Sequence, residues 1–428
     1  MSDRPSFHPV LAAAALLLLL AVAAALWFFA KPATPPGVPL PKGAATPPLT
    51  LSALGEAPDW TTLTPFARTQ TMARFREVFQ RVYSDGSPAG PPLFHVDDGR
   101  LTVAKYSAQP EVDPFSLEMG DTAPPPRYWR AAAELPPAAD PQKPLEGVRI
   151  AIDPGHIGGA WAKMEERWYQ LPGQTVEVME GEMTLAVAKL LKPTLEALGA
   201  GVTLVRESTE PVTALRPEDF ARDTLTKKAA EGLFYRKAEI QARAAVINSQ
   251  IRPDFTVCLH FNAEAWGNPA RPALTEVNHL HMIVNGHYGP DELARDDERH
   301  QMLVRLLQRV DDEEIPLSAE VGASLAAATG LPPYDYAAGH MAANAHRALP
   351  DNPYVWARNL IANRLYQCPV VFCEPYVMNC REVYERIAAG DYAGEKDVAG
   401  KVRKSLFREY ADAVAEGVKA HYLRHRPK

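Results

Sequence analysis

From residue 148 onward, short apolar segments alternate with amphipathic ones, and this alternation constrains the fold more than any other feature. The apolar segments read as buried strands, and the amphipathic segments have helical spacing. This order is typical of a mostly parallel sheet flanked by helices. The segments are VRIAID, MTLAVAKLLKPTLEALGA, GVTLVR, YRKAEIQARAAVINSQ, DFTVCLHFN and CPVVFCEP. We therefore expect an α/β fold for this part of the chain.

Polar side chains follow three of these predicted strands at the point where each strand ends. Asp153 and His156 follow the first strand, His260 and Asn262 follow DFTVCL, and Glu374 ends the last strand. Ligands of such sheets bind beyond the carboxyl ends of the strands. These residues are therefore the first candidates for a functional site.

Two histidines and a carboxylate from different elements, with one position left open, make the ligand set of a catalytic zinc site. The histidines are His156 and His260, and Glu180 or Glu182 at the start of the first helix supplies the carboxylate. Taken singly, a histidine at a strand end is often structural, and acidic residues in a first helical turn complement the helix dipole. The convergence of three strand ends and one helix start favours a metal site.

The same segments resemble, in their order, the zinc-dependent N-acetylmuramoyl-L-alanine amidases, which are cell-wall enzymes with a central mixed sheet. The resemblance covers about residues 147–423 and implies hydrolysis of the amide between N-acetylmuramic acid and L-alanine of the peptide stem. It rests on IAIDPGH, EGEMTLAVAKLLKPTLEALGAGVTLVR, RAAVINSQIRPDFTVCLHFNA and CPVVFCEPYVMN.

The resemblance also implies roles for single residues. His156, Glu180 and His260 would bind Zn²⁺, with Glu182 as the alternative third ligand, and Glu374 would be the catalytic carboxylate. Peptidoglycan would be the substrate.

Two further residues and two departures from the family pattern accompany this assignment. Asn262 would contact substrate or serve the loop structurally, and Asp153 would fix a histidine or the turn from behind the ligands. The approach from the first histidine to the glutamate, IGGAWAKMEERWYQLPGQ, is longer than in the family, and Pro375-Tyr376 replaces the usual Gly-Phe.

Two other functions stay open at this point. His279 and His281 alternate along one predicted strand, with His287 beyond, and as metal ligands they would define a zinc peptidase acting on the peptide stem. The sequence lacks the H-E-x-x-H signature of many metallopeptidases. The second alternative is an inactive, membrane-tethered module that binds the cell wall.

The N-terminus carries an uncharged apolar stretch over residues 10–30, VLAAAALLLLLAVAAALWFFA. At ~1.5 Å per residue it is long enough to cross ~30 Å of hydrocarbon. Its Trp27, Phe28 and Phe29 are typical of an interfacial belt, which favours an uncleaved signal anchor over a cleaved signal. We expect a protein of the bacterial cell envelope, anchored in the membrane with its catalytic domain in the periplasm.

Composition supports this division of the chain. The formal net charge of −7 excludes a generally cationic nucleic-acid binder, and the four cysteines are too few for a disulfide-stapled scaffold. The 40 prolines cluster early and mark linkers. We expect a signal anchor at 1–30, a Pro-rich linker at 31–58, a small α+β module with a hairpin at 59–107, a Pro-rich connector at 108–146 and the zinc amidase domain at 147–428.

An insertion at residues 286–318 contains DERHQMLVRLLQRV, whose apolar residues have helical spacing. Some amidases that this chain resembles carry an insert that covers the zinc until a partner releases it. By analogy, the helix is either a lid controlled by a regulatory protein, with a carboxylate from residues 311–314 plugging the zinc site, or only a further cover of the sheet.

Overall fold

The computed structural model describes residues 46–87, 93–97, 99–269, 271–336 and 344–428. The chain forms two compact units. Unit 1 comprises Met1–Pro126 and Tyr288–Leu307, and unit 2 comprises Arg127–His287 and Gln308–Lys428. The predicted membrane anchor, residues 10–30, lies outside the described residues. Within the described ranges, no helix has both the length and the apolar character needed to cross a membrane.

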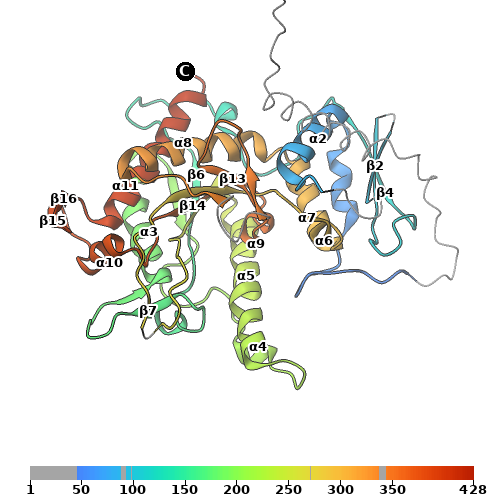
Figure 1. The fold of residues 1–428 in the computed structure, drawn as a ribbon. Helices are drawn as coiled ribbons and strands as arrows, with labels where there is room; N and C mark the ends of the chain where they lie inside the picture. Colours follow the sequence, from blue (N-terminus) through green and yellow to red (C-terminus); the bar gives the residue numbers. More distant parts are fainter. Residues whose placement is uncertain (1–45, 88–92, 98, 270, 337–343) are drawn as a thin grey trace, which may run out of the picture. The chain divides into compact units, whose positions relative to one another are not determined.

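Unit 2 is built on a seven-stranded sheet in the order β12-β13-β11-β14-β10-β6-β9 (Figure 1). Neighbours from β14 to β9 pair in parallel, whereas β11 runs antiparallel to β14. The predicted mostly parallel sheet flanked by helices is therefore confirmed. Its strands are β6 (Arg149–Pro154), β9 (Gly201–Leu204), β10 (Phe255–Leu259), β11 (Leu280–Val284), β12 (His346–Arg347), β13 (Val355–Ala357) and β14 (Val370–Pro375).

Helices cover both faces of this sheet, so the central strands are buried on both sides and read as apolar runs. One face packs against α3 (Glu180–Ala197), α8 (Asp311–Thr329) and α11 (Leu406–His425). The other face packs against a continuous helical column (Figure 1), and its core includes Ala244 and Ile247 of the column with Ala151, Cys258 and Phe372 of the sheet. The column consists of α4 (Lys227–Leu233), η6 (Phe234–Ala238), α5 (Glu239–Ala245) and η7 (Val246–Ile251).

Shorter elements complete unit 2. Two further hairpins pair β7 (Trp168–Gln170) with β8 (Glu177–Met179) and β15 (Lys396–Val398) with β16 (Lys401–Arg403). The short helices are η3 (Ala132–Glu134), η4 (Gly159–Trp161), η5 (Pro217–Phe220), α9 (Ile361–Leu365) and α10 (Arg381–Ala388).

Unit 1 contains a three-stranded antiparallel sheet of β2 (Phe94–Asp97), β3 (Arg100–Val103) and β4 (Phe115–Glu118). The predicted hairpin is confirmed by the pairing of β2 with β3. The predicted domain boundaries themselves stay predictions. The remaining elements are η1 (Trp60–Phe66), β1 (Thr69–Gln70), α2 (Met72–Val78), η2 (Phe79–Tyr83), β5 (Gly120–Asp121), α6 (Pro290–Leu293) and α7 (Asp296–Leu307).

The helix predicted within the insertion is confirmed as α7, and it belongs to unit 1. Asp296 is fully buried and accepts hydrogen bonds from the backbone N–H groups of Thr50 (2.8 Å) and Ser107 (3.0 Å). Arg299, also fully buried, donates to the carbonyl of Ala104 at 2.8 Å. Charged side chains of α7 thus form hydrogen bonds with other segments of unit 1. The proposed lid role of α7 stays a prediction.

The carboxylate plug predicted from residues 311–314 is wrong. Glu314 is buried and accepts hydrogen bonds from the backbone N–H groups of Asn285 and Val370, both at 2.8 Å. Glu313 accepts from Ala132 N at 3.1 Å. Since Val370 begins β14 and Glu374 lies near its other end, these carboxylates satisfy buried backbone donors away from the carboxyl ends of the strands.

A glycine permits the close packing of α11 against α8, and we predict that replacing it destabilises unit 2. A Cβ added at Gly417 would lie 2.5 Å from Val321 Cα and 3.0 Å from Glu320 O, so the two helix backbones would have to separate. We expect Gly417→Ala to lower the free energy of unfolding by ~1–3 kcal/mol in urea denaturation.

Gly232→Ala in α4 is the matched control, because no atom lies within 4 Å of a Cβ added there. It should leave stability unchanged or raise it by up to ~1 kcal/mol. Equal effects of the two substitutions would contradict the packing explanation.

Candidate active site

Two glycines bring the turn after β6 against the first turn of α3. A Cβ added at Gly181 would lie 2.3 Å from Gly158 N, and Gly158 itself has a φ of +84°. His156, in the same turn, has a φ of 55°, a left-handed conformation that is uncommon for residues with a side chain. This close approach places His156 beside Glu180, the first residue of α3.

His260 follows β10 and is held between a ring and a backbone. Its imidazole stacks on Phe372 of β14, with ring centroids 4.4 Å apart and 13° between the planes. On the other side, a Cβ added at Gly155 would lie 2.3 Å from Cε1 of His260. The ring position therefore depends on glycine at residue 155.

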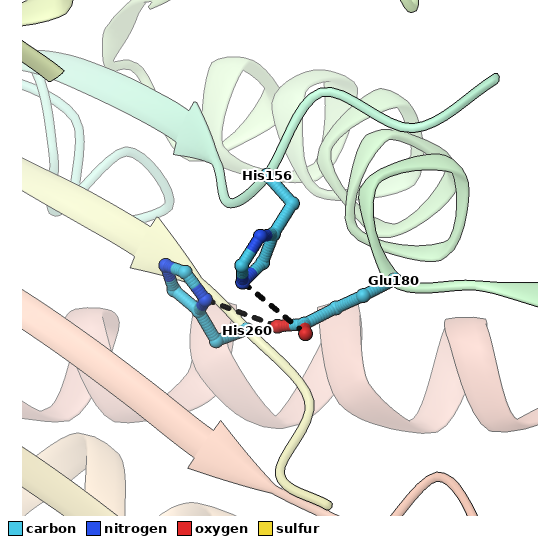
Figure 2. A group of neighbouring side chains, drawn as sticks. All are labelled: His156, Glu180 and His260. Carbon is cyan, nitrogen blue, oxygen red and sulfur yellow. Dashed lines mark hydrogen bonds and ion pairs between the residues drawn. The ribbon is translucent and has the colours of Figure 1, made fainter. Parts of the chain in front are cut away.

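Glu180 joins the two histidines (Figure 2). Its Oε1 lies 3.0 Å from His260 Nδ1, and its Oε2 lies 3.3 Å from His156 Nε2. Glu180 also accepts from Phe261 N at 3.1 Å and lies 3.2 Å from Arg167 Nε. Burial would raise the pKa of Glu180, but the positive charge of His156, the hydrogen bond from His260 and the charge of Arg167 lower it to about 2. The carboxylate is thus ionised at neutral pH.

These three side chains can hold a metal ion. One ligand atom from each of His156, Glu180 and His260 lies within 4.8 Å of the others, and no other such group occurs in the described part of the chain. Glu182, the alternative ligand, is exposed and does not belong to the group. Two imidazole nitrogens and one carboxylate oxygen are a donor set that fits Zn²⁺.

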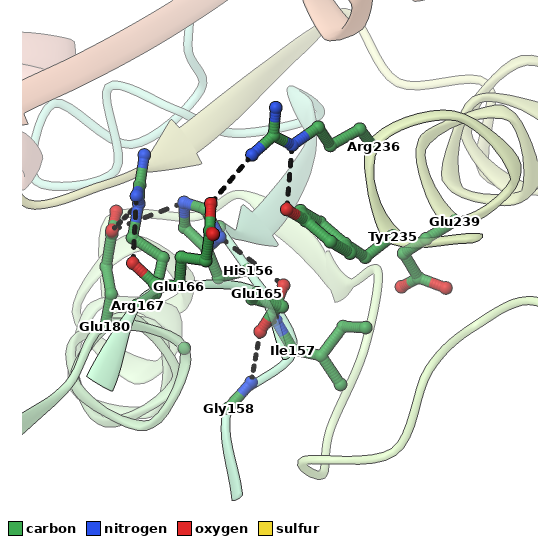
Figure 3. Close-up of polar contacts among 12 residues, drawn as sticks. His156, Ile157, Gly158, Glu165, Glu166, Arg167, Glu180, Tyr235, Arg236 and Glu239 are labelled. Carbon is green, nitrogen blue, oxygen red and sulfur yellow. Dashed lines mark hydrogen bonds and ion pairs between the residues drawn. The ribbon is translucent and has the colours of Figure 1, made fainter. Parts of the chain in front are cut away.

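A second buried carboxylate, Glu165, supports His156 from behind (Figure 3). It accepts hydrogen bonds from Ile157 N at 2.9 Å and Gly158 N at 3.0 Å, and it lies 3.4 Å from His156 Nδ1. Burial would raise the pKa of Glu165, but the hydrogen bond from His156 and its charge lower it. An Nδ1 proton directed at Glu165 leaves Nε2 as the lone-pair donor facing Glu180.

The sequence analysis missed Glu165. Its only signal is the acidic pair Glu165-Glu166 inside the unusually long approach to α3. The sequence does not show that this segment folds back and contacts the turn after β6.

Asp153 affects the site through the residues to which it is hydrogen-bonded. It accepts hydrogen bonds from Arg243 Nη1 at 2.9 Å and from the Tyr366 hydroxyl at 2.6 Å. Arg243 in turn donates to the carbonyl of His156 at 2.8 Å and to Glu239 at 2.8 Å. Asp153 therefore holds the arginine that fixes the backbone of the turn.

Glu374 faces the same cavity as the three potential ligands. This cavity has a volume of about 840 Å³ and is lined among others by His156, Glu180, His260, Asn262 and Glu374. Burial raises the pKa of Glu374 to about 7, with the charges of His260, Arg167 and Arg358 opposing this shift and that of Glu180 adding to it. Glu374 can therefore exchange a proton near neutral pH.

Asn262 lines the cavity while its own polar groups serve the loop. Its backbone N–H donates to the carbonyl of Tyr376 at 2.9 Å, and its Oδ1 accepts from Ala263 N at 2.6 Å. The structure thus places Asn262 at the cavity and gives it a local structural contact.

The alternative ligands do not join this group of three side chains. His279 and His281 are not part of the metal-binding group found in the described residues, and His279 Nε2 lies 3.5 Å from Glu264. All four cysteines are buried and free, and none belongs to that group.

The fold and this site together define an α/β protein whose candidate centre consists of two histidines, a carboxylate and a neighbouring acid. The chain is similar to three solved amidases. The CwlD amidase from Clostridioides difficile, in complex with the GerS lipoprotein, has 14% identity over 64% of this chain and 98% of that chain, with a TM-score of 0.38. The amidase Ami1 from Mycobacterium abscessus has 17% identity over 64% and 99%, with a TM-score of 0.36.

The third is the amidase AmiC2 of Nostoc punctiforme, with 16% identity over 65% of this chain and 99% of that chain and a TM-score of 0.36. No curated protein sequence matches the chain. Residues 150–302 match the model of the N-acetylmuramoyl-L-alanine amidase family. This match confirms the resemblance seen in the sequence and supports peptidoglycan amidase activity.

We predict that His156, Glu180 and His260 bind zinc. His156→Ala, Glu180→Gln and His260→Ala should each reduce the metal content from about one ion per chain to near zero, because three protein ligands make the site. Plasma emission spectroscopy of the purified proteins measures this. Glu182→Gln, which changes an exposed residue of the same helical turn, should keep its zinc. Full metal content in both histidine variants would place the metal elsewhere.

Proposed function

We propose that the domain hydrolyses the amide between the lactyl group of N-acetylmuramic acid and L-alanine with zinc held by His156, Glu180 and His260. The observation that supports this most directly is the position of Glu374. It faces the cavity that the three ligands also line, on the neighbouring strand to the one that His260 follows. A base outside the ligand set, beside an open ligand position, suits hydrolysis by an activated water.

The roles of the side chains follow from this arrangement. When bound, Zn²⁺ lowers the pKa of a coordinated water and polarises a carbonyl. Glu374 accepts the proton of the attacking water and passes it to the leaving nitrogen of alanine, so that the C–N bond breaks to a carboxylate and an amine. Glu165 and Arg243 hold the turn of His156, and Phe372 holds the ring of His260.

Glu374→Gln tests this mechanism. The variant should keep its zinc, because Glu374 is not a ligand, and should lose about 10²- to 10⁴-fold in turnover, the usual contribution of a general acid-base. Incubation with purified peptidoglycan, with and without chelator, followed by mass spectrometry of the products, measures the new alanine amino termini. Glu182→Gln is the control with unchanged turnover.

Two results would contradict the proposal. Wild-type turnover in Glu374→Gln would remove its role as base. New amino termini inside the peptide stem, rather than at its first alanine, would identify a peptidase instead.

We also propose that residues 10–30 anchor the protein in the membrane of a bacterial envelope, with unit 2 in the periplasm and the Pro-rich residues 31–58 as a tether. The uncharged stretch and its aromatic end support this. We expect the full chain in the membrane fraction and a chain lacking residues 1–30 in the soluble fraction. Extraction of the full chain by high salt alone would argue against a spanning anchor.

A further inference from the structure

One wall of the active-site cavity comes from β11, the segment at residues 334–336 and the end of β13. His281 of β11 pairs directly with Glu374 of β14 in the antiparallel register, so the two side chains stand on the same face of the sheet. On the next strand, Trp356 pairs with Ile283, and Arg358 follows two residues later. Alternation along the strands places Arg358 on this face too.

Two buried polar atoms on this wall are incompletely satisfied. His281 Nδ1 has no hydrogen-bond partner among the described residues, and the Tyr336 hydroxyl has only the Arg358 side chain beside it. Their side chains are only 3% and 1% exposed. Leaving a buried polar group without a partner costs free energy, which a bound ligand can recover. Both residues line the cavity that contains Glu374.

Arg358 adds a positive charge that acts on both Glu374 and Tyr336. The other cations of the cavity are engaged, since Arg167 pairs with Glu180 and Lys163 lies 4.2 Å from the centre of the Trp168 ring. Within the ranges that the structure describes, Arg358 forms no ion pair. Arg358 is half-buried and lines the cavity.

The protonation states of the two neighbours agree with hydrogen-bond donation. Burial, with the charges of His279 and Arg358, holds the pKa of His281 well below its usual value, so the imidazole is neutral and carries one N–H. Burial raises the pKa of Tyr336 to about 12, against the charge and the hydrogen bond of Arg358, so the hydroxyl keeps its proton.

We propose that Arg358, Tyr336 and His281 form a subsite for a carboxylate of the peptide stem. The proposal rests on the proposed function, because it takes the stem to be the substrate. A guanidinium with two neutral donors matches the two oxygens of a carboxylate. Glu264, a carboxylate that also lines the cavity, lies 3.5 Å from Nε2 of His279.

The distance between Glu374 and Arg358 indicates which carboxylate of the stem is bound. Two strand spacings, about 10 Å, separate β14 from β13. An extended stem covers that distance with about three residues. The subsite therefore takes a carboxylate of the second or third stem residue, while the scissile amide lies at Glu374.

Binding of the released stem tests the proposal without hydrolysis. The probes are the free tripeptide that begins with L-alanine and two analogues, one with the free carboxylate of the second residue and one with that of the third replaced by a carboxamide. Calorimetric titration of the full chain should show one analogue binding about 10- to 100-fold more weakly, as expected for a hydrogen-bonded ion pair.

Arg358→Gln should weaken binding of the tripeptide by the same factor and leave binding of that analogue unchanged. Arg358→Lys should recover part of the loss, which also shows that the variant protein folds. Arg381→Gln, at an exposed ion pair with Glu276, is the control with unchanged affinity. Equal affinity of the wild-type chain for all three probes, or an equal loss for all three in Arg358→Gln, would overturn the subsite.

The hydrolysis assay separates the two proposals. Cleavage at the first alanine with no carboxylate preference in binding leaves the amidase mechanism standing and removes the subsite. A carboxylate preference without cleavage there supports the subsite and removes the mechanism.

Discussion

The buried carboxylate of Glu180 is the interaction on which the active site depends. An ionised carboxylate that is 1% exposed is costly unless charged and hydrogen-bonding partners surround it. Glu180 finds them in His156, His260, Arg167 and the backbone N–H of Phe261. These partners come from the turn after β6, the approach to α3 and the end of β10. The Glu180 side chain thus contacts three separate parts of the chain.

These contacts of Glu180 require unusually close backbone packing. Glycine at 155, 158 and 181 removes the Cβ atoms that would collide with His260 or with the facing backbone. The left-handed conformation of His156 is tolerated because the surrounding contacts over-determine it, including hydrogen bonds that Glu165 and Arg243 make to the turn. Strain of this kind is typical of functional sites, where orientation matters more than local stability.

The central residues of the site can be predicted from the sequence because they lie at the ends of strands and at the start of a helix. His156, His260 and Glu374 each follow or end an apolar strand, and Glu180 begins an amphipathic helix, so local patterns alone point to them. Glu165, Tyr336 and Arg358 carry no such signal. Glu165 lies in an irregular segment, and Arg358 joins the site only because β11 lies next to β14 and β13 follows on the far side of β11. The order of strands in a sheet depends on contacts between distant segments, which periodicity does not encode.

The sequence by itself determined the alternation of strands and helices, the resemblance to the amidases and the helix within the insertion, because hydrophobic periodicity and short motifs are local properties. Only the tertiary structure decided where that helix belongs, since α7 buries its charges within unit 1. It also decided that Glu313 and Glu314 serve buried backbone donors rather than a metal. The antiparallel entry of β11 beside β14, which sets His281 against Glu374, is likewise a long-range pairing. Buried backbone groups and charges need hydrogen-bonding or charged partners, and these often come from distant parts of the chain. A local sequence pattern does not show which distant residue will be the partner.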